Sequence, residues 1–476
     1  MRCIPAVLLA SMAWVNVPSA SAQDAIPGGV IAEFQQKADN SSIVWLRSDK
    51  DYSTTDIEAL ARKILGDTYI AEQGGEEFLT KNVGNFTLLR AFSLPVSAAI
   101  AKARIAEGNL SSEIAAIHSN SLVYGMGSEC GEEEDQNSIS NSESLPLNIR
   151  RVNPSPTSVG TLQKIVWIVD SGVAPGSDIA SELNIVEQRL CTVSCMPEGV
   201  TDLVGHGTMI AGIIGARIGN NKEMIGVAPG VRIVALRIFT TSYPVDLLSN
   251  ALAALQYINT VATAGDVVNV SFGSYYNPLK VPGATAGTFD LSNESKTEGL
   301  LRELAKNRML FISLAAGNTD VVGGSGYVQT ISPARAGGYR DPPTGTPTGA
   351  VLTVSAVRSR NQANWKDTFW KFSAYGNGDI NSANGLQLGP PDFAAPGVRI
   401  RSLWPGSTAN PNGQTNVCSG TSFSAAHVSG LLVYGMPSTD KRALWDPSAL
   451  IPGKSPGSEV QADYETGKQD PIAKKP

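Results

Sequence analysis

Three side chains of the types that carry out nucleophilic catalysis occur along the chain in the order Asp, His, Ser. Asp170 ends the apolar run of residues 165–169, His206 lies in a Gly-His-Gly-Thr turn, and Ser422 lies in a Gly-Thr-Ser turn. A carboxylate can orient an imidazole, and the imidazole can then take a proton from the hydroxyl as its oxygen attacks a carbonyl carbon. The three residues therefore predict catalysis by a serine nucleophile.

Each of these residues also has a structural explanation. Asp170 can cap a turn, Ser422 can cap the helix-like stretch that follows it, and a lone His in a turn need not be functional. However, the chain contains only three His, and Asp–His–Ser is one of the chain orders in which catalytic triads occur. The order favours one catalytic group over three unrelated residues.

The sequence around these residues resembles the subtilisin-like serine peptidases over roughly residues 145–435. The matching motifs are Val-Asp-Ser-Gly-Val at 169–173, Gly-His-Gly-Thr at 205–208, Ser-Phe-Gly-Ser at 271–274, Ala-Ala-Gly-Asn at 315–318, Ala-Pro-Gly at 395–397 and Gly-Thr-Ser at 420–422. Chance would very rarely produce so many of these motifs in the same order.

The resemblance implies a serine endopeptidase that works through an acyl-enzyme. Asp170, His206 and Ser422 would form the triad, and the Asn318 amide would bind the oxyanion together with the backbone N–H of Ser422. An ordinary Gly-Asn turn is the alternative explanation for Asn318.

The resemblance also implies how a substrate is held. Ser271, Phe272 and Gly273 would form the substrate-binding strand, which pairs with an extended peptide through backbone hydrogen bonds. One departure is that Ala426 stands where the family more often has Pro before the second His. This change concerns helix packing, and the resemblance implies a structural role for His427.

Two other functions fit parts of the sequence. A catalytically silent subtilisin-like binding or scaffold protein is one, but every functional group needed for catalysis is present. A serine hydrolase acting on a non-peptide ester is the other, but the strand-like residues 271–274 favour an extended peptide. The formal net charge of −6 at pH 7 argues against nucleic acid or an anionic membrane as a partner.

Short apolar runs alternating with helical stretches predict an α/β fold over residues 151–435. The runs cover residues 165–169, 233–238, 267–270, 309–314 and 351–357, with helical stretches at 247–261 and 297–307. This pattern predicts a mainly parallel sheet with helices on both faces, as in the three-layer subtilisin-like fold. Sites in such sheets lie beyond the carboxyl ends of the strands. Residues 436–476 are rich in Pro, Gly, Lys and Asp and predict a loosely held tail.

The first 22 residues have the pattern of an export signal. Arg2 precedes the largely apolar residues 4–17, and Ala-Ser-Ala at 20–22 is a small-residue cleavage site. A short buried helix is the alternative. Cleavage after Ala22 would give a secreted or periplasmic protein, and no later stretch approaches the about 20 apolar residues of a membrane span.

Residues 23–126 resemble the propeptide of the family, an inhibitor and folding aid that the enzyme removes itself. Strand-like residues 42–47, 85–92 and 114–124 alternate with helical residues 55–65 and 96–107. A permanent accessory domain is the alternative.

The end of this segment predicts how the precursor matures. Residues 114–126 would lie in the active-site groove paired with residues 271–274, and self-cleavage would fall close to residues 124–127. Residues 127–150 form an acidic linker, which would let the new N-terminus move away after the cut.

The cysteines and one loop suggest further stabilising features. Cys130, Cys191, Cys195 and Cys418 remain after signal cleavage and allow three pairings. Cys191 and Cys195 are close enough to close a small loop, which would leave Cys130 and Cys418 as the second pair.

No cofactor is required by the chemistry, but calcium is possible as a structural ion. Asp178 and the Gly-Asn-Asn loop at 219–221 resemble parts of the family's stabilising calcium site, and oxygen donors in a loop suit Ca²⁺. An ordinary Asn-rich turn is the alternative. Finally, the Gly- and Pro-rich insertion at 336–347 could reshape the walls of the substrate pocket.

Overall fold

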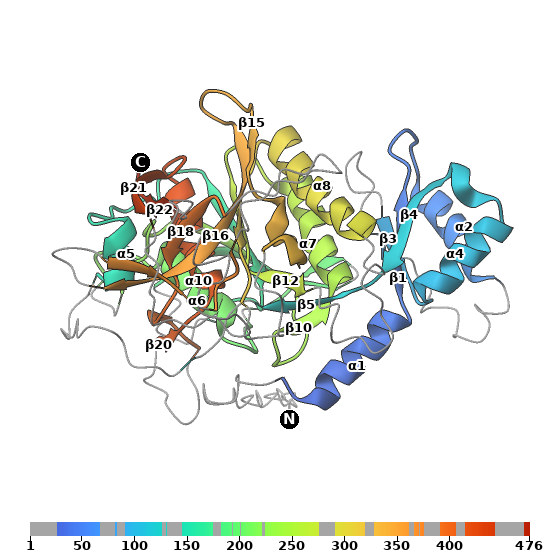
Figure 1. Cartoon of the computed structure of the whole chain (residues 1–476), viewed down its shortest axis with the longest axis horizontal. Coiled ribbons are helices and arrows are strands. Elements are labelled where there is room, and N and C mark those ends of the chain that lie inside the picture. The colour runs from blue at the N-terminus through green and yellow to red at the C-terminus, as the bar shows by residue number, and fades with distance from the viewer. Residues whose placement is uncertain are drawn as a thin grey trace, which may run out of the picture.

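The fold is built on one large sheet (Figure 1). The computed structural model describes residues 26–66, 81–82, 91–125, 130, 145–174, 182–192, 194–199, 201–220, 224–275, 291–318, 328–360, 366–370, 372–375, 391–405, 415–442 and 471–476. Within these residues the large sheet has 12 strands. Its parallel strands are, in spatial order, β7 (Asn184–Cys191), β9 (Arg232–Arg237), β6 (Ile165–Asp170), β11 (Val267–Val270), β13 (Phe311–Ala315), β16 (Gly349–Arg360), β18 (Phe393–Pro396) and β22 (Pro471–Lys474).

Helices cover both faces of this sheet because its strands are apolar on both sides. Val166 and Ile168 of β6 join the buried cluster that contains α6 (His206–Gly215) and α10 (Thr421–Leu432). Trp167 and Val169 face the opposite way and join the cluster that contains α7 (Leu248–Val261) and α8 (Leu291–Asn307). This alternation follows from the two-residue repeat of a strand. The predicted mainly parallel sheet between two helix layers is confirmed.

The end of the chain differs from the predicted loose tail. The strand β22 pairs with β18, and β21 (Ser438–Arg442) pairs with β22 at the edge of the large sheet. Ile472 and Ala473 are buried. The prediction missed these strands because edge strands of this kind carry polar residues and depend on pairing between distant segments.

A small α+β unit lies beside α7 and α8 (Figure 1). Its sheet has the order β2 (Lys81–Asn82), β3 (Ala91–Leu94), β1 (Ser42–Leu46) and β4 (Ile114–Ser119), and its helices are α2 (Thr54–Leu65) and α4 (Ala98–Glu107). Val44 and Leu46 pack with α2 and α4, whereas Ile43 and Trp45 join the cluster of α7 and α8. One face of this sheet therefore closes its own core, and the other docks on the large domain.

Residues 114–124 form two strands, where the sequence predicted one. The first, β4, belongs to the small unit, and the second, β5 (Leu122–Gly125), lies in a separate sheet between β10 (Val245–Leu247) and β12 (Phe272–Tyr275), with β14 (Ile331–Ser332) beyond β12. The helix α1 (Gly28–Asp39) lies beside β10 (Figure 1). Its residues Phe34 and Ala38 pack in one cluster with Leu122 and Tyr124 of β5.

The remaining elements are short. They are α5 (Leu147–Val152), β8 (Cys195–Pro197), β15 (Tyr339–Asp341), β17 (Lys366–Phe369), β19 (Ile400–Leu403), β20 (Thr415–Cys418), η2 (Leu110–Ser112), η4 (Val328–Thr330) and η5 (Ala334–Ala336). Because α5 starts at Leu147 and buries Ile149, the predicted boundary between residues 150 and 151 falls inside a helix of the large domain.

The insertion at 336–347 lies away from the predicted site. Its strand β15 pairs with residues 349–351 at the amino end of β16, while sites lie at the carboxyl ends of parallel strands. The effect of this insertion on the pocket walls stays a prediction.

Several predicted features lie outside the described residues, including the signal at 1–22, Asp178, Asn221 and most of the linker. None of the described helices is long and apolar enough to cross a membrane.

Candidate active site

Asp170 and His206 form a buried pair at the carboxyl end of the large sheet. Asp170 is the last residue of β6, and His206 opens α6. The Nδ1 atom of His206 lies 2.8 Å from Oδ1 and 2.9 Å from Oδ2 of Asp170. The carboxylate thus fixes the imidazole with its Nε2 atom pointing the other way. This Nε2 atom is buried and has no hydrogen-bond partner among the described residues.

Two glycines allow the backbones that carry this pair to touch. Gly172 has φ of 92°, and a Cβ on it would lie 2.2 Å from the carbonyl oxygen of Thr201. A Cβ on Gly207 would lie 2.0 Å from the carbonyl oxygen of Gly172. Neither position can hold a larger residue without moving backbone. The close approach of the two backbones therefore explains why both motifs have glycine at these positions.

A second buried carboxylate organises the turn before His206. Asp202 accepts hydrogen bonds from the backbone N–H groups of Val204, Gly205 and Thr208 at 2.7–3.0 Å, and from the Thr208 hydroxyl at 2.7 Å. Burial raises the pKa of Asp202, and these donors offset part of that effect because they favour the charged form. The sequence prediction missed Asp202. Its signal was an Asp shortly before a helix start, where such side chains commonly bind backbone N–H groups.

The pKa of His206 reflects both carboxylates. Burial lowers this pKa because the imidazolium loses hydration, but the charges of Asp170 and Asp202 act in the opposite direction. The net effect is a pKa above the ordinary value of 6.5.

Ser422 is buried in the first turn of α10, next to Phe423. The neighbouring Phe423 has its ring centroid 5.5 Å from that of His206. The hydroxyl of Ser422 donates to the carbonyl oxygen of Ser271 at 3.5 Å, a long contact. The structure therefore brings the three predicted residues to one place, with Asp170 and His206 bonded and the Ser422 hydroxyl turned to Ser271.

Asn318 follows β13 and is fixed by the start of α10. Its Oδ1 accepts from the backbone N–H of Thr421 at 3.0 Å and from the Thr421 hydroxyl at 2.8 Å. The same hydroxyl accepts from the N–H of Gly317 at 3.0 Å. With Oδ1 bonded to Thr421, the donor group of the Asn318 side chain is its amide nitrogen. Both this amide and the amino end of α10 suit developing negative charge.

The predicted substrate-binding residues border a strand that is bound like a peptide. Phe272 pairs with Gly125 and Gly273 with Tyr124, in antiparallel register. Ser271 precedes this strand, and its hydroxyl accepts from Asn269 at 2.7 Å. On the other side, β10 pairs with residues 122–124 of β5. The sequence prediction missed this second wall because β10 is only three residues long.

The other two His residues are buried away from this chemistry. His427 has its Nδ1 atom 2.6 Å from the carbonyl oxygen of Phe423 and its Nε2 atom 3.0 Å from Nδ2 of Asn148. Burial lowers its pKa to about 4, so it is neutral and links α10 to α5. The structural role implied for His427 agrees with these contacts. His118 accepts from the Trp45 indole in the small unit.

Both disulfide pairings suggested by the cysteine spacing are present. Cys130 is bonded to Cys418, and Cys191 is bonded to Cys195. The described residues hold no cluster of three or more His, Cys, Asp or Glu side chains that could bind a metal ion. Because Asp178 and Asn221 lie outside them, calcium binding stays a prediction.

Comparison with known proteins gives the family. The sequence model of the subtilase family matches residues 164–448, which contain Asp170, His206, Asn318 and Ser422. The chain belongs to the subtilase family. This confirms the resemblance drawn from the sequence motifs.

The relatives are distant, and each match covers only part of both chains. The chain is 27% identical over 281 residues to Mycosin-3 from Mycobacterium tuberculosis, covering 56% of this chain and 57% of that protein. It is 26% identical over 309 residues to M-protease from Shouchella clausii, covering 63% of this chain and 61% of that protein. The chain thus spans less than two thirds of the length of these relatives.

A solved structure supports the fold. Fervidolysin from Fervidobacterium pennivorans, a keratinolytic enzyme related to subtilisin, is similar with a TM-score of 0.53 and 17% identity. The match covers 83% of this chain and 54% of that chain. At this identity the likeness concerns the fold alone, which is the predicted subtilisin-like one.

Proposed function

We propose that this subtilase is a serine endopeptidase, made as a latent precursor and exported. The observation that carries the proposal is the buried Asp170–His206 pair, whose Nε2 atom has no hydrogen-bond partner among the described residues. The pair lies in one site with Ser422 and with a strand bound as a peptide would be. Family membership supports the same reaction class.

The proposed reaction starts at Ser422. Its hydroxyl turns from Ser271 to Nε2 of His206, which takes the proton as the oxygen attacks the peptide carbonyl carbon. Asp170 holds the imidazole and stabilises its cation. The new oxyanion accepts hydrogen bonds from the Asn318 amide and the Ser422 backbone N–H.

The second half of the reaction releases both products. Nε2 of His206 passes its proton to the leaving amine, and the C–N bond breaks to leave an acyl-enzyme on Ser422. A water molecule then gives a proton to His206 and attacks the ester carbonyl. Collapse of that intermediate frees the acid product and returns the proton to Ser422.

The position of β5 supports a latent precursor. Its residues fill the place of a substrate between β12 and β10, and both Ser422 and His206 are buried. Residues 23–126 would thus act as a propeptide that blocks the groove until the chain cuts itself. The self-cleaved bond would follow Gly125 closely, since the described part of β5 ends there beside Ser271.

Export is supported by the two disulfides, because such bonds persist in oxidising compartments. The pattern of the first 22 residues agrees with removal of a signal after Ala22. Protein or peptide substrates follow from the strand-like binding site.

Replacing Ser422 with Ala tests the proposal. The variant should keep its fold, lose peptide hydrolysis and accumulate with residues 23–126 attached, because the hydroxyl is needed only for covalent attack. N-terminal sequencing and casein hydrolysis measure both effects. In the wild-type protein a serine-directed phosphonyl reagent should label Ser422. Label on another serine, or trimming of purified Ser422→Ala at the same bond, would overturn the assignment.

A further inference from the structure

One position of the bound strand β5 leaves no room for a side chain. Gly125 pairs with Phe272, and its N–H donates to the carbonyl oxygen of Pro244 at 2.9 Å. A Cβ built on Gly125 would lie 2.9 Å from Cβ of Pro244 and 3.6 Å from Cε2 of Phe239. The first distance is shorter than carbon atoms tolerate, so a larger residue requires the strand or its wall to move.

The wall at this position is fixed. Cβ of Pro244 belongs to a ring with a restricted backbone angle, so it cannot rotate away as a flexible side chain can. Phe239 is fully buried. The turn that links Phe239 to Pro244 is held by Asp246. Its Oδ2 accepts from the backbone N–H and the hydroxyl of Thr240 at 2.9 and 2.6 Å. The Asn250 side chain donates to Oδ1 of the same carboxylate at 2.9 Å.

The adjacent Tyr124 position of β5 is not limited by the same wall. Tyr124 points to the opposite face, where it packs in one cluster with Phe34 and Ala38 of α1 and with Val245. Because α1 belongs to the proposed propeptide, a separate substrate would meet only part of these contacts. Side-chain size should therefore matter much less at the Tyr124 position.

We propose that Pro244 and Phe239 make this peptidase select glycine at the substrate position that Gly125 occupies. The inference rests on the proposed function, in which β5 lies in the groove as a substrate does. Since β5 runs antiparallel to β12 and ends beside Ser271, which accepts from Ser422, the selected glycine lies within the last few residues before the cleaved bond. The substrate class is thus proteins with an accessible, extended segment that contains such a glycine.

Matched peptides test this selection. The first carries the sequence of residues 119–129 between a fluorophore and a quencher, the second has Gly125→Ala, and the third has Tyr124→Ala. With enzyme matured from the full-length chain, kcat/KM should fall about tenfold or more for Gly125→Ala, as expected for overpacking a rigid site. It should fall less than about threefold for Tyr124→Ala, since that side chain is not enclosed by the rigid wall.

A change in the enzyme should weaken the preference. In Pro244→Gly the closest atom is gone, so the ratio of kcat/KM between the glycine and alanine peptides should drop at least about fivefold relative to wild type. Equal cleavage of both peptides by the wild-type enzyme would overturn the glycine selection and leave the endopeptidase standing. If no peptide is cut and Ser422 is not labelled by the phosphonyl reagent, the proposed function fails, and the inference fails with it.

Discussion

In the proposed mechanism His206 is the general base, and its surroundings fix its orientation and raise its pKa above the ordinary value. Asp170 supplies the orientation through Nδ1, and the charges of Asp170 and Asp202 outweigh the effect of burial on the pKa. Asp202 does not contact a reacting atom. It acts through the turn that holds His206, where it binds three backbone N–H groups.

The pH dependence of catalysis follows from this balance. His206 must be neutral to accept the Ser422 proton, so kcat/KM should be lost as the pH falls through a pKa above 6.5, the ordinary value. Replacing Asp202 with Asn removes one negative charge and should move this acidic limb to lower pH. A profile of kcat/KM against pH for a short peptide measures the shift.

The matched control for this shift is Asp266→Asn. Asp266 is also buried, but it binds the Trp167 indole at 3.1 Å and the N–H of Ile165 at 2.9 Å, at the amino end of β6. The limb should stay in place in this variant. If Asp202→Asn also leaves the limb unchanged, the proposed electrostatic effect of Asp202 on His206 is wrong.

At the scale of elements, the sequence predicted helices and strands best where the segment itself has a clear pattern of apolar residues. The apolar run at 267–270 is the strand β11, and the helical residues 55–65 and 96–107 match α2 and α4 to within two residues. The triad was visible because each of its residues lies in a short Gly-rich motif. Elements whose stability comes from distant partners were missed, such as β10, β21 and β22.

The connection between the small unit and the large domain illustrates this limit. The sequence predicted a linker that releases the new N-terminus after self-cleavage. The structure fastens this linker at both ends, through Cys130 to Cys418 and through the packing of α5. Cys418 lies four residues before Ser422. A new N-terminus formed after Gly125 would lie only a few residues from Cys130 and could not leave the neighbourhood of the groove.

Removing this disulfide should therefore change the mature N-terminus. In the double variant Cys130→Ser, Cys418→Ser, residues 127–144 are held at one end only, so we expect the peptidase to trim them further. N-terminal sequencing of the matured proteins should show a single start in the wild type and later starts in the variant. The control is Cys191→Ser with Cys195→Ser, which should keep the wild-type start. Identical starts in all three proteins would contradict the tether.

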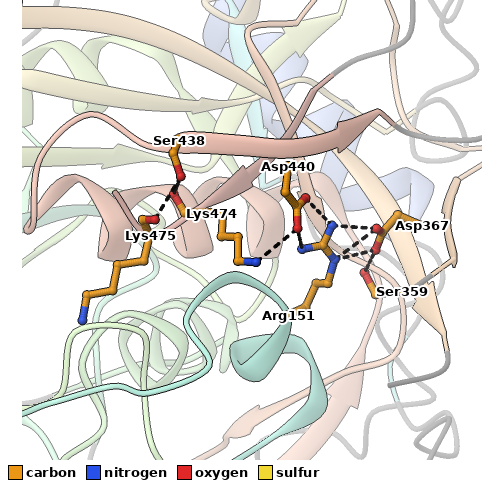
Figure 2. Close-up of polar contacts among 7 residues, drawn as sticks. All are labelled: Arg151, Ser359, Asp367, Ser438, Asp440, Lys474 and Lys475. Carbon is orange, nitrogen blue, oxygen red and sulfur yellow. Dashed lines mark hydrogen bonds and ion pairs between the residues drawn. The ribbon is translucent and has the colours of Figure 1, made fainter. Parts of the chain in front are cut away.

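At the scale of the whole molecule, one buried arginine joins the two ends of the large domain. Arg151 of α5 binds Asp367 of β17 through Nε and Nη2 at 2.8–3.1 Å, and Asp440 of β21 through Nη1 and Nη2 at 2.8 and 3.0 Å. Figure 2 shows Ser359 and Lys474 completing the group. The side chains of Arg151 and Asp367 are at most 1% exposed.

This arrangement explains why the C-terminal residues return to the sheet. The backbone N–H of Lys475 donates to the carbonyl oxygen of Val152 at 2.8 Å, so β22 is fixed to α5 as well as to β18. Asp440 brings β21 to the same guanidinium. The first helix of the large domain and its last two strands thus form one unit, whose loss would open an edge of the sheet next to β18.

The last prediction concerns this unit. Replacing Arg151 with Met keeps the apolar stem but leaves the buried Asp367 carboxylate without its cation, which should cost about 3–5 kcal/mol in the free energy of unfolding. Urea unfolding in the Ser422→Ala background measures this without self-digestion, and Lys37→Met is the control. Lys37 pairs with Glu33 on the exposed surface of α1, where such pairs contribute at most about 1 kcal/mol. Equal midpoints for the two variants would mean that Arg151 does not hold the ends of the domain together.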